Sequence, residues 1–263
     1  MRSHPAGDVD YDAAPPAYAR VRRPDPHLAA VIGAALGDAR TVLNVGAGAG
    51  SYEPPGREVT AVEPSASMRA QRPAGLAAAT DAVAEDLPFG DGQFDAAMAI
   101  ITVHQWPDLE AGLGELRRVT TGPVVVATFD PARLRQFWLR DWGPALLASE
   151  AGRMPALDRI AAGLGGPVRT EVARLPLHCT DGFVTAFYGR PEALLQAEVR
   201  RAQSAWNFLP DGAEDQIVAE LGAAIESGRW DAAYGALRTT AYYDGGYRLV
   251  VSERPPGPTA AGR

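Results

Sequence analysis

The 263-residue chain contains no lysine and a single cysteine, Cys179. Without lysine it has neither a lysine-containing P-loop for nucleotide phosphates nor a Schiff-base or pyridoxal-phosphate site. One cysteine excludes an intrachain disulfide, and the four histidines are scattered without the spacing of zinc ligands. We therefore predict no metal site and no lysine-dependent cofactor.

Long apolar runs and an excess of positive charge are also missing. No stretch of about 18 apolar residues occurs, and the N-terminal residues hold no run of signal-peptide type, so we expect a cytoplasmic protein without a membrane span. The net charge of −7 leaves no electrostatic footprint for nucleic acid, and anionic membrane surfaces would repel the chain. We expect a small-molecule partner, and the sequence indicates no oligomeric state.

The most informative stretch is residues 41–51, TVLNVGAGAGS, together with residues 59–63, VTAVE. Each segment is an apolar run, and together they are typical of the first two strands of a parallel sheet with a ligand cleft at the strand tips. The first run opens into Gly46, Gly48 and Gly50. Glycine lets backbone approach a ligand without an intervening Cβ. The second run ends in Glu63, whose carboxylate can accept two hydrogen bonds from a ribose diol.

The spacing of these residues distinguishes two ligand classes. Dinucleotide sites read G-x-G-x-x-G, begin a full helix there for the pyrophosphate, and place the acid about 20 residues further on. Here the glycines alternate, Glu63 lies 63 − 50 = 13 residues after Gly50, and Pro54 and Pro55 limit any helix between them. A nucleoside without phosphates fits best, with S-adenosylmethionine as the candidate. A dinucleotide site and a structural turn without a ligand are the alternatives.

Residues 40–129 resemble the class I S-adenosylmethionine-dependent methyltransferases, in particular the small-molecule group. Each matching motif is weak alone, but their order and spacing together are specific for the fold and the cofactor. The motifs are LNVGAGAG at 43–50, VEPS at 62–65 with Met68, AEDLPF at 84–89, FD at 94–95 and ELRRV at 115–119.

The resemblance implies which residues contact the cofactor. Residues 11–26 would close over it as an N-terminal flap in which an arginine meets the methionine carboxylate; a solvated surface turn is the alternative. Met68 would flank the adenine or simply pack in the core. Val83 stands where family members often have an Asp that holds the adenine amino group, so the adenine contact is expected from the backbone around Ala84 and Glu85. A second departure is Asn44, which replaces a common acidic residue in the first motif. The expected cofactor site is Tyr18, Arg22, Asn44, Gly46, Gly48, Glu63, Met68, Ala84, Glu85 and Thr102.

The hydrophobic pattern predicts an α/β fold with a doubly wound, mostly parallel, Rossmann-like sheet and a helical lid inserted after the fifth strand. We expect strands at 41–45, 59–63, 79–84, 94–101 and 122–129, and helices at 28–36, from Ser65 to before Pro73, and at 108–119. After these come helices within 130–166, a strand at 168–178, helices at 191–208 and 216–225, and strands at 239–243 and 247–252, the last joining the sheet. We divide the chain into an N-terminal flap and helix (1–40), a cofactor-binding core (41–129), lid helices and completing strands of the same domain (130–252), and a disordered tail (253–263).

Methyl transfer from a sulfonium is an in-line displacement in which positioning alone supplies much of the rate. A base is needed when the acceptor arrives protonated, and His104, just past the tip of the fourth predicted strand, is the candidate; packing under the lid is the alternative. Trp106 would form a wall for the acceptor. His178 and Tyr188, with Asp181, would form a second polar edge, although Thr180 and Asp181 also read as a helix cap. Trp138 and Trp142 would line an aromatic pocket, although aromatics at helical spacing are more often core.

These features predict methyl transfer from S-adenosylmethionine to an O, N or C centre of a small apolar or aromatic metabolite. The alternative is a methyltransferase fold that binds the cofactor or a ligand without transferring methyl, as an isomerase, a cyclase or a binding protein. The negative charge disfavours tRNA or protein substrates.

Overall fold

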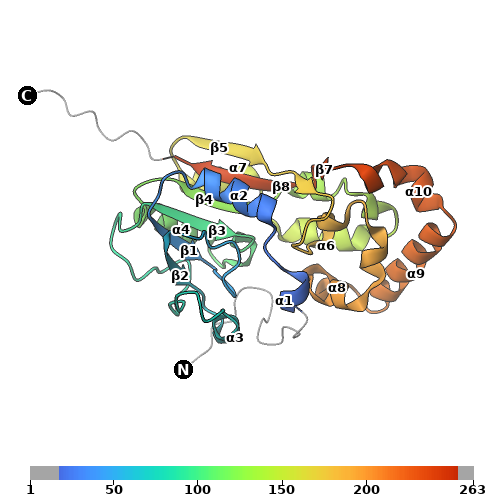
Figure 1. The fold of residues 1–263 in the computed structure, drawn as a ribbon, viewed down its shortest axis with the longest axis horizontal. Coiled ribbons are helices and arrows are strands. Elements are labelled where there is room, and N and C mark those ends of the chain that lie inside the picture. Colours follow the sequence, from blue (N-terminus) through green and yellow to red (C-terminus); the bar gives the residue numbers. More distant parts are fainter. Residues whose placement is uncertain (1–17, 254–263) are drawn as a thin grey trace, which may run out of the picture.

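A six-stranded sheet lies on one side of the molecule, with its strands in the order β2-β1-β3-β4-β8-β5 (Figure 1). The computed structural model describes residues 18–253. The strands β1, β2, β3 and β4 run parallel, whereas β8 pairs antiparallel with both β4 and β5. The strands span Thr41–Val45 (β1), Glu58–Val62 (β2), Ala96–Ile100 (β3), Val124–Phe129 (β4), Val168–Val172 (β5) and Tyr247–Ser252 (β8).

The burial of each strand follows from its position in the sheet. Every residue of β4 and β8 is buried, as expected for central strands covered on both faces, and β4 reads as an uninterrupted apolar run apart from Thr128. β5 lies at the sheet edge and carries charged, exposed residues such as Arg169. Charge on an edge strand also discourages pairing with other chains.

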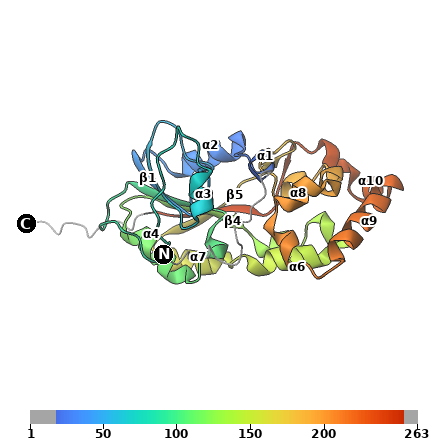
Figure 2. The same ribbon diagram turned by 90° about the horizontal axis from the view of Figure 1, so that it is seen from below.

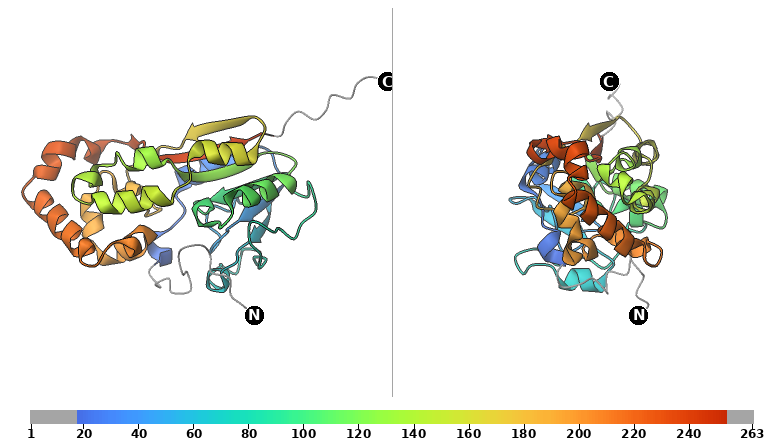
Figure 3. Two further views of the ribbon diagram at one scale, coloured as in Figure 1. Left: turned by 180° about the vertical axis from the view of Figure 1, so that it is seen from behind. Right: turned by 90° about the vertical axis from the view of Figure 1, so that its right-hand side faces the viewer.

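Helices cover both faces of this sheet (Figure 2). On one face α2 (Pro26–Ala35) places Leu28 and Ile32 against strand residues such as Val42. On the other face α4 (Leu109–Arg118) and α7 (Leu157–Leu164) lie side by side, and their apolar residues pack with Leu43. Figure 3 shows this pair from behind. The sheet is therefore doubly wound and mostly parallel, as predicted.

Polar caps fix where the helices begin. The carboxylate of Asp25 accepts hydrogen bonds from two backbone N–H groups at the start of α2. The side chain of Ser65 caps α3 (Ala66–Ala70), and that of Asp108 caps α4. Each cap pairs a backbone donor that the first helical turn leaves without a partner. The predicted helix starts at Ser65 and Asp108 are confirmed.

The segments after β4 build a helical region beside the sheet (Figures 1 and 2). We use the name helical region for residues 131–239 without α7, β5 and β6. Its α-helices are α5 (Pro131–Leu134), α6 (Pro144–Arg153), α8 (Ala197–Arg201), α9 (Ala213–Glu226) and α10 (Arg229–Tyr234). Its 3-10 helices are η3 (Trp138–Asp141), η4 (Val184–Phe187), η5 (Pro191–Leu195), η6 (Ser204–Phe208) and η7 (Gly235–Thr239). Elsewhere lie α1 (Tyr18–Val21), η2 (Val103–Gln105) and a small sheet of β6 (Leu175–Pro176) with β7 (Tyr242–Tyr243).

The predicted strand at 79–84 is wrong. Only one parallel bridge forms there, between Val62 and Thr80, supported by two backbone hydrogen bonds of 2.8 and 3.0 Å. Alanines and a charged Asp81 leave this segment partly exposed, so it has no apolar face to bury against the sheet. The sheet consequently has four parallel strands where five were expected.

Two further segments are broken where the pattern predicted continuous elements. The strand expected at 168–178 splits into β5 and β6, because β6 leaves the main sheet to pair with β7. The helix expected at 191–208 divides into η5, α8 and η6, since the backbone is extended at Gln196 and Gln203. The tail beyond residue 253 and residues 11–17 of the predicted flap lie outside the described residues.

Candidate functional site

A cavity of about 1440 Å³ opens at the carboxyl ends of the parallel strands and continues to the helical region. Its walls include the ends of β1, β2, β3 and β4, and on the far side residues of α6 and η6. Pockets for a single small ligand usually measure roughly 300–1,000 Å³. This cavity therefore has room for two reactants at once.

The glycine loop after β1 is shaped by contacts within the protein. Gly46 and Gly48 both adopt positive φ, +69° and +53°, which glycine tolerates without a Cβ penalty. A Cβ on Gly46 would overlap the side chain of Thr102, and one on Gly48 would lie 3.2 Å from Met68 Cε. The N–H groups of Gly46 and Ala47 both donate to the carbonyl of Val62, at 2.9 Å each. The loop is thus tied to the ends of two neighbouring strands, and both glycines line the cavity.

Glu63 stands at the end of β2 and is only 5% exposed. One carboxylate oxygen accepts from Gly48 N–H at 2.8 Å and the other from Ser65 N–H at 2.9 Å. Burial raises the pKa of Glu63, although these hydrogen bonds and two nearby arginines oppose the shift. Each oxygen retains a lone pair for a further donor, and Glu63 lines the cavity. The carboxylate is held in one orientation that hydroxyl groups of a ligand can reach.

Asn44 carries an amide where the family pattern has a carboxylate. Its Nδ2 donates to Glu53 Oε1 at 3.2 Å, and Glu53 is paired with Arg72 at 2.9 Å, both side chains being 4% exposed. The Asn44 amide is thus hydrogen-bonded to the buried carboxylate of Glu53. Asn44 itself lines the cavity.

The cavity walls next to the glycine loop contain the residues expected near the adenine. Met68, Ala84 and Glu85 all line it, and so does Thr102 beyond β3. Glu85 Oε1 also accepts from Asp108 N–H at 3.2 Å, so the loop that follows residue 84 is joined to the start of α4. The structure thus brings these four predicted residues to one cavity.

Arg22 joins the N-terminal segment to the helical region across 159 residues of sequence. Its Nε donates to Asp181 Oδ1 at 2.5 Å, and Tyr52 O–H donates to Asp181 Oδ2 at 3.0 Å. The backbone adds a bridge between Arg22 and Asp181 and a hydrogen bond from Gly182 N–H to Val21 C=O. All three side chains line the cavity, so a solvated turn is the wrong interpretation for Arg22. Tyr18 belongs to α1, and its side chain lies outside the described residues.

Tyr52 and Ile101 are the two non-glycine residues among 18–253 with positive φ, +63° and +52°. Both line the cavity. A left-handed backbone costs about 1–2 kcal/mol for a residue with a Cβ. Burial, reinforced by the charge of Asp181, also raises the pKa of Tyr52, so its hydroxyl stays protonated and donates. Such strain commonly marks functional sites.

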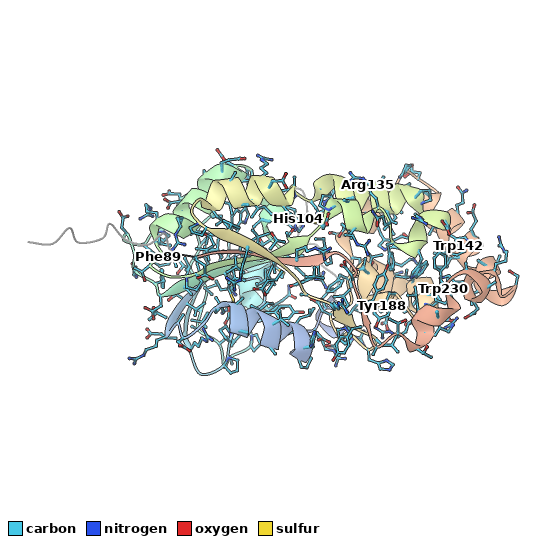
Figure 4. All side chains as sticks on the ribbon, turned by 90° about the horizontal axis from the view of Figure 1, so that it is seen from above. Phe89, His104, Arg135, Trp142, Tyr188 and Trp230 are labelled. Atoms are coloured by element: carbon cyan, nitrogen blue, oxygen red, sulfur yellow. The ribbon has the colours of Figure 1, made fainter. Side chains whose placement is uncertain are left out.

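His104 and Trp106 follow the end of β3 and line the cavity. Figure 4 shows His104 between the sheet and the helical region. The Gln105 Nε2 lies 3.4 Å from His104 Nε2 and donates to it in the imidazole tautomer that leaves Nε2 unprotonated. Trp106 packs closely over Gly112 of α4, where a Cβ would overlap the indole. Both side chains therefore belong to the cavity wall.

Four residues predicted to bind substrate do not line this cavity: Trp138, Trp142, His178 and Tyr188. The prediction that these four residues line the acceptor pocket is wrong. Trp138 packs edge-on against Trp142 and donates its indole N–H to the Tyr188 carbonyl at 2.9 Å. Tyr188 donates to the Thr240 carbonyl at 2.7 Å, and His178 is exposed. Figure 4 places Trp142 in the helical region, away from His104. These aromatic side chains pack in or against the hydrophobic core, where burial of their large apolar area stabilises the fold.

The predicted helix cap at Thr180 and Asp181 is also wrong. The next helix, η4, begins after Phe183 and has no side-chain cap. The Thr180 N–H instead donates to Asp25 Oδ2 at 3.0 Å, and Asp181 binds Arg22 and Tyr52. Both residues therefore serve the junction with the N-terminal segment.

Several cavity residues gave no signal in the sequence. They are Tyr52, Phe129, Glu150 and Gln203. They come from four separate segments of the chain. Glu150 and Gln203 belong to the helical region, whose position relative to the strand ends no local motif encodes.

Among residues 18–253 no helix is long and apolar enough to cross a membrane. The same residues contain no group of three or more His, Cys, Asp or Glu side chains arranged to hold a metal ion.

Comparisons with a protein family and with solved structures both matched methyltransferases. Residues 43–123 match a family described as a methyltransferase domain. A solved structure from Anabaena variabilis ATCC 29413, described as a methyltransferase from an antibiotic biosynthesis pathway, is 29% identical with a TM-score of 0.82. The alignment covers 89% of this chain and 99% of that one. A comparison with curated proteins found no match.

More distant structures share the fold alone. A S-adenosylmethionine-dependent methyltransferase from Thermotoga maritima is 16% identical with a TM-score of 0.50, covering 87% of this chain and 88% of its own. The [4+2]-cyclase SpnF is 16% identical with a TM-score of 0.51, covering 98% of this chain and 89% of its own. The same architecture thus occurs in a protein described as a cyclase.

Proposed function

Because residues 43–123 match a methyltransferase domain and a structure described as a methyltransferase is 29% identical over 89% of this chain, we propose that the chain is a class I S-adenosylmethionine-dependent methyltransferase. It would transfer the methyl group of S-adenosylmethionine to a small apolar or aromatic metabolite. The observation that carries the proposal is one continuous cavity of about 1440 Å³. It joins the glycine loop and Glu63 at the strand ends to a chamber under the helical region. Donor and acceptor can therefore meet inside one cavity.

The residues at the strand ends fit S-adenosylmethionine. Glu63 presents a fixed carboxylate to the ribose hydroxyls, and Gly46 and Gly48 present backbone without side chains. Alternating glycines and the absence of lysine offer no cradle for a diphosphate. When bound, the cofactor supplies an activated methyl group on a positively charged sulfur.

The protein's contribution to transfer is mainly positioning. Phe129 and Phe183 bound the chamber with apolar surface, and Trp106 is fixed against α4. Holding two reactants in contact and excluding water supplies a large part of a displacement rate. His104 lies at the end of β3 and would accept the proton of a hydroxyl or carbon acid as it attacks.

The nature of the acceptor rests on the chamber and on the relative from Anabaena. That relative, 29% identical over nearly its whole length, is described as part of an antibiotic biosynthesis pathway. An apolar or aromatic metabolite is in keeping with both the aromatic walls and that description.

The test separates cofactor binding from transfer. Calorimetric titration with S-adenosylmethionine and S-adenosylhomocysteine should give binding of both, and absence of binding would refute the proposal. Formation of S-adenosylhomocysteine is then followed with a library of neutral aromatic and aliphatic metabolites. Cofactor binding without transfer to any of them favours the alternative of a binding protein, isomerase or cyclase.

His104→Ala tests the proton acceptor once a substrate is found. We expect a rate loss of about 10²-fold or more with unchanged affinity for S-adenosylhomocysteine, as for removal of a general base. Gln105→Ala is the matched control on the same short helix. A loss of less than tenfold in the His104 variant would assign the imidazole to packing.

A further inference from the structure

The cavity wall contains more acidic than basic side chains. Two arginines line it, Arg22 and Arg69, and each is paired with a carboxylate that also lines it, Asp181 and Asp81. Among residues 18–253, the acidic side chains in the wall are Glu63, Asp81, Glu85, Asp86, Glu150 and Asp181. This surplus of negative charge suits the net positive charge of S-adenosylmethionine. It repels a second ligand that carries a carboxylate or phosphate, because like charges interact strongly in a partly desolvated cavity.

A buried amide lies at the far end of the cavity, in the helical region. Gln203 lines the cavity and is only 5% exposed. The indole N–H of Trp206 donates to Gln203 Oε1 at 3.1 Å. An indole nitrogen can only donate, so the amide oxygen must face Trp206 and the amide nitrogen is fixed on the other side.

The amide nitrogen of Gln203 has no hydrogen-bond partner among residues 18–253. Most buried polar groups in folded proteins are paired, so an orphan donor in a cavity wall points to a ligand atom. The only group that can satisfy it is a hydrogen-bond acceptor.

The local backbone explains how the amide reaches this place. Gln203 has extended backbone, φ −119° and ψ 112°, between α8 and η6. This break turns the chain so that Gln203, Ser204 and Ala205 all line the cavity. Arg153 of α6 donates to Ser204 Oγ at 2.9 Å, and this hydrogen bond joins α6 to η6. The Nη1 of Arg153 also lies 3.5 Å from Oε2 of Glu150 on the same helix.

Resting on the proposed function, we propose that Gln203 determines acceptor specificity. Its Nε2 donates to a neutral oxygen of the substrate, a carbonyl or an ether, while the carboxylates of the wall exclude acids. Apolar side chains such as Phe183 and Val184 contact the body of the same molecule. The substrate class is therefore an uncharged, largely apolar molecule with an acceptor oxygen away from the atom that is methylated.

Three phenols of similar size test this specificity on the full chain saturated with S-adenosylhomocysteine. 4-Hydroxyacetophenone carries a neutral carbonyl, 4-ethylphenol has the same outline without it, and 4-hydroxybenzoate carries a charge. We expect the ketone to bind about fivefold to tenfold more tightly than 4-ethylphenol, as for one net hydrogen bond. We expect 4-hydroxybenzoate to bind most weakly. Equal or tighter binding of 4-hydroxybenzoate, or failure of all three phenols to bind, would overturn the inference.

Gln203→Met is the sharpest variant, because it keeps an unbranched side chain of similar length and removes the N–H donor. A glutamate buried in this acidic wall would instead take up a proton and could donate again. The preference for the ketone over 4-ethylphenol should disappear in Gln203→Met. Gln196→Met, at an exposed residue that also has extended backbone, is the matched control and should keep the preference. If Gln203→Met does not fold, Gln203→Leu tests the same loss of the donor. A retained preference in the folded variant overturns the inference.

Failure of this inference is distinguishable from failure of the proposed function. S-adenosylhomocysteine binds at the strand ends, so its affinity should be the same in the wild-type chain and in both Gln203 variants. Absence of that binding in the wild type refutes the methyltransferase proposal. Normal cofactor binding without the ketone preference refutes the role of Gln203 alone.

Discussion

Replacing Glu63 with alanine tests how the cofactor is bound. The carboxylate is 5% exposed and already accepts hydrogen bonds from Gly48 N–H and Ser65 N–H. A ribose diol would add one or two bonds to the same charged acceptor, each contributing about 1.5–3 kcal/mol. Loss of one bond should weaken binding of S-adenosylhomocysteine about tenfold to 150-fold, and loss of both by more than about 150-fold.

The unliganded protein should be affected less than the complex. Glu63→Ala removes two hydrogen bonds, but it also removes a carboxylate whose ionised form is penalised by burial. These two effects oppose each other in the free energy of unfolding. Circular dichroism and thermal unfolding of the unliganded variant therefore establish that any loss of affinity comes from the missing ligand contacts.

The pH dependence has a definite sign. Burial raises the pKa of Glu63 above the ordinary value of 4.5, so its contribution to unliganded stability is fully present below that value. That contribution is lost as the pH rises through the folded-state pKa. Ligand hydroxyls favour the ionised carboxylate, so affinity for S-adenosylhomocysteine should rise over the same range. The Glu63→Ala variant should lack this rise.

Isothermal titration calorimetry with S-adenosylhomocysteine is the assay. Glu58→Ala, which removes an exposed acid from the same strand, is the control and should bind normally. If the folded Glu63→Ala variant binds within about threefold of the wild type, the carboxylate does not hold the ribose. The assignment of this strand end to a nucleoside would then be wrong.

Three further predictions concern the framework of the site. Arg22→Ala leaves the buried Asp181 carboxylate without its guanidinium and should lower the free energy of unfolding by about 3 kcal/mol, measured by chemical denaturation. Gly46→Ala combines a positive φ with overlap on Thr102 and should cost about 2–4 kcal/mol in the same measurement. Cys179 is buried and burial raises the pKa of its thiol to about 12, so it should not react with dithionitrobenzoate at about pH 8 until the chain unfolds.

Matched variants make these predictions specific. Arg20→Ala, at a side chain 78% exposed, should change stability by less than about 1 kcal/mol. Gly33→Ala, in the middle of α2 with open space around it, should stabilise by roughly 0.5–1 kcal/mol. An equal effect for Arg22→Ala and Arg20→Ala would contradict the buried pair. Rapid modification of Cys179 in the folded protein would contradict its burial.

The sequence by itself determined the half of the cavity at the strand ends. An apolar run predicted β1 at Thr41–Val45 and a second run placed Glu63 at the end of its neighbour. Parallel strands bring their carboxyl ends to one edge, so the acid and the glycine loop had to meet. The helix caps at Ser65 and Asp108 were also predictable, because a cap depends only on the residues of one helical turn.

Only the tertiary structure decided the other half. Arg22 and Asp181 are separated by 159 residues, and no local pattern encodes their pairing. The break at Gln203 interrupts a segment whose apolar periodicity predicts one continuous helix. Trp138 and Tyr188 were expected in the pocket but are buried in the core, where they contact residues of distant segments. Periodicity reports how one segment divides between apolar and polar faces, whereas the choice of partner for each face depends on packing of the whole chain.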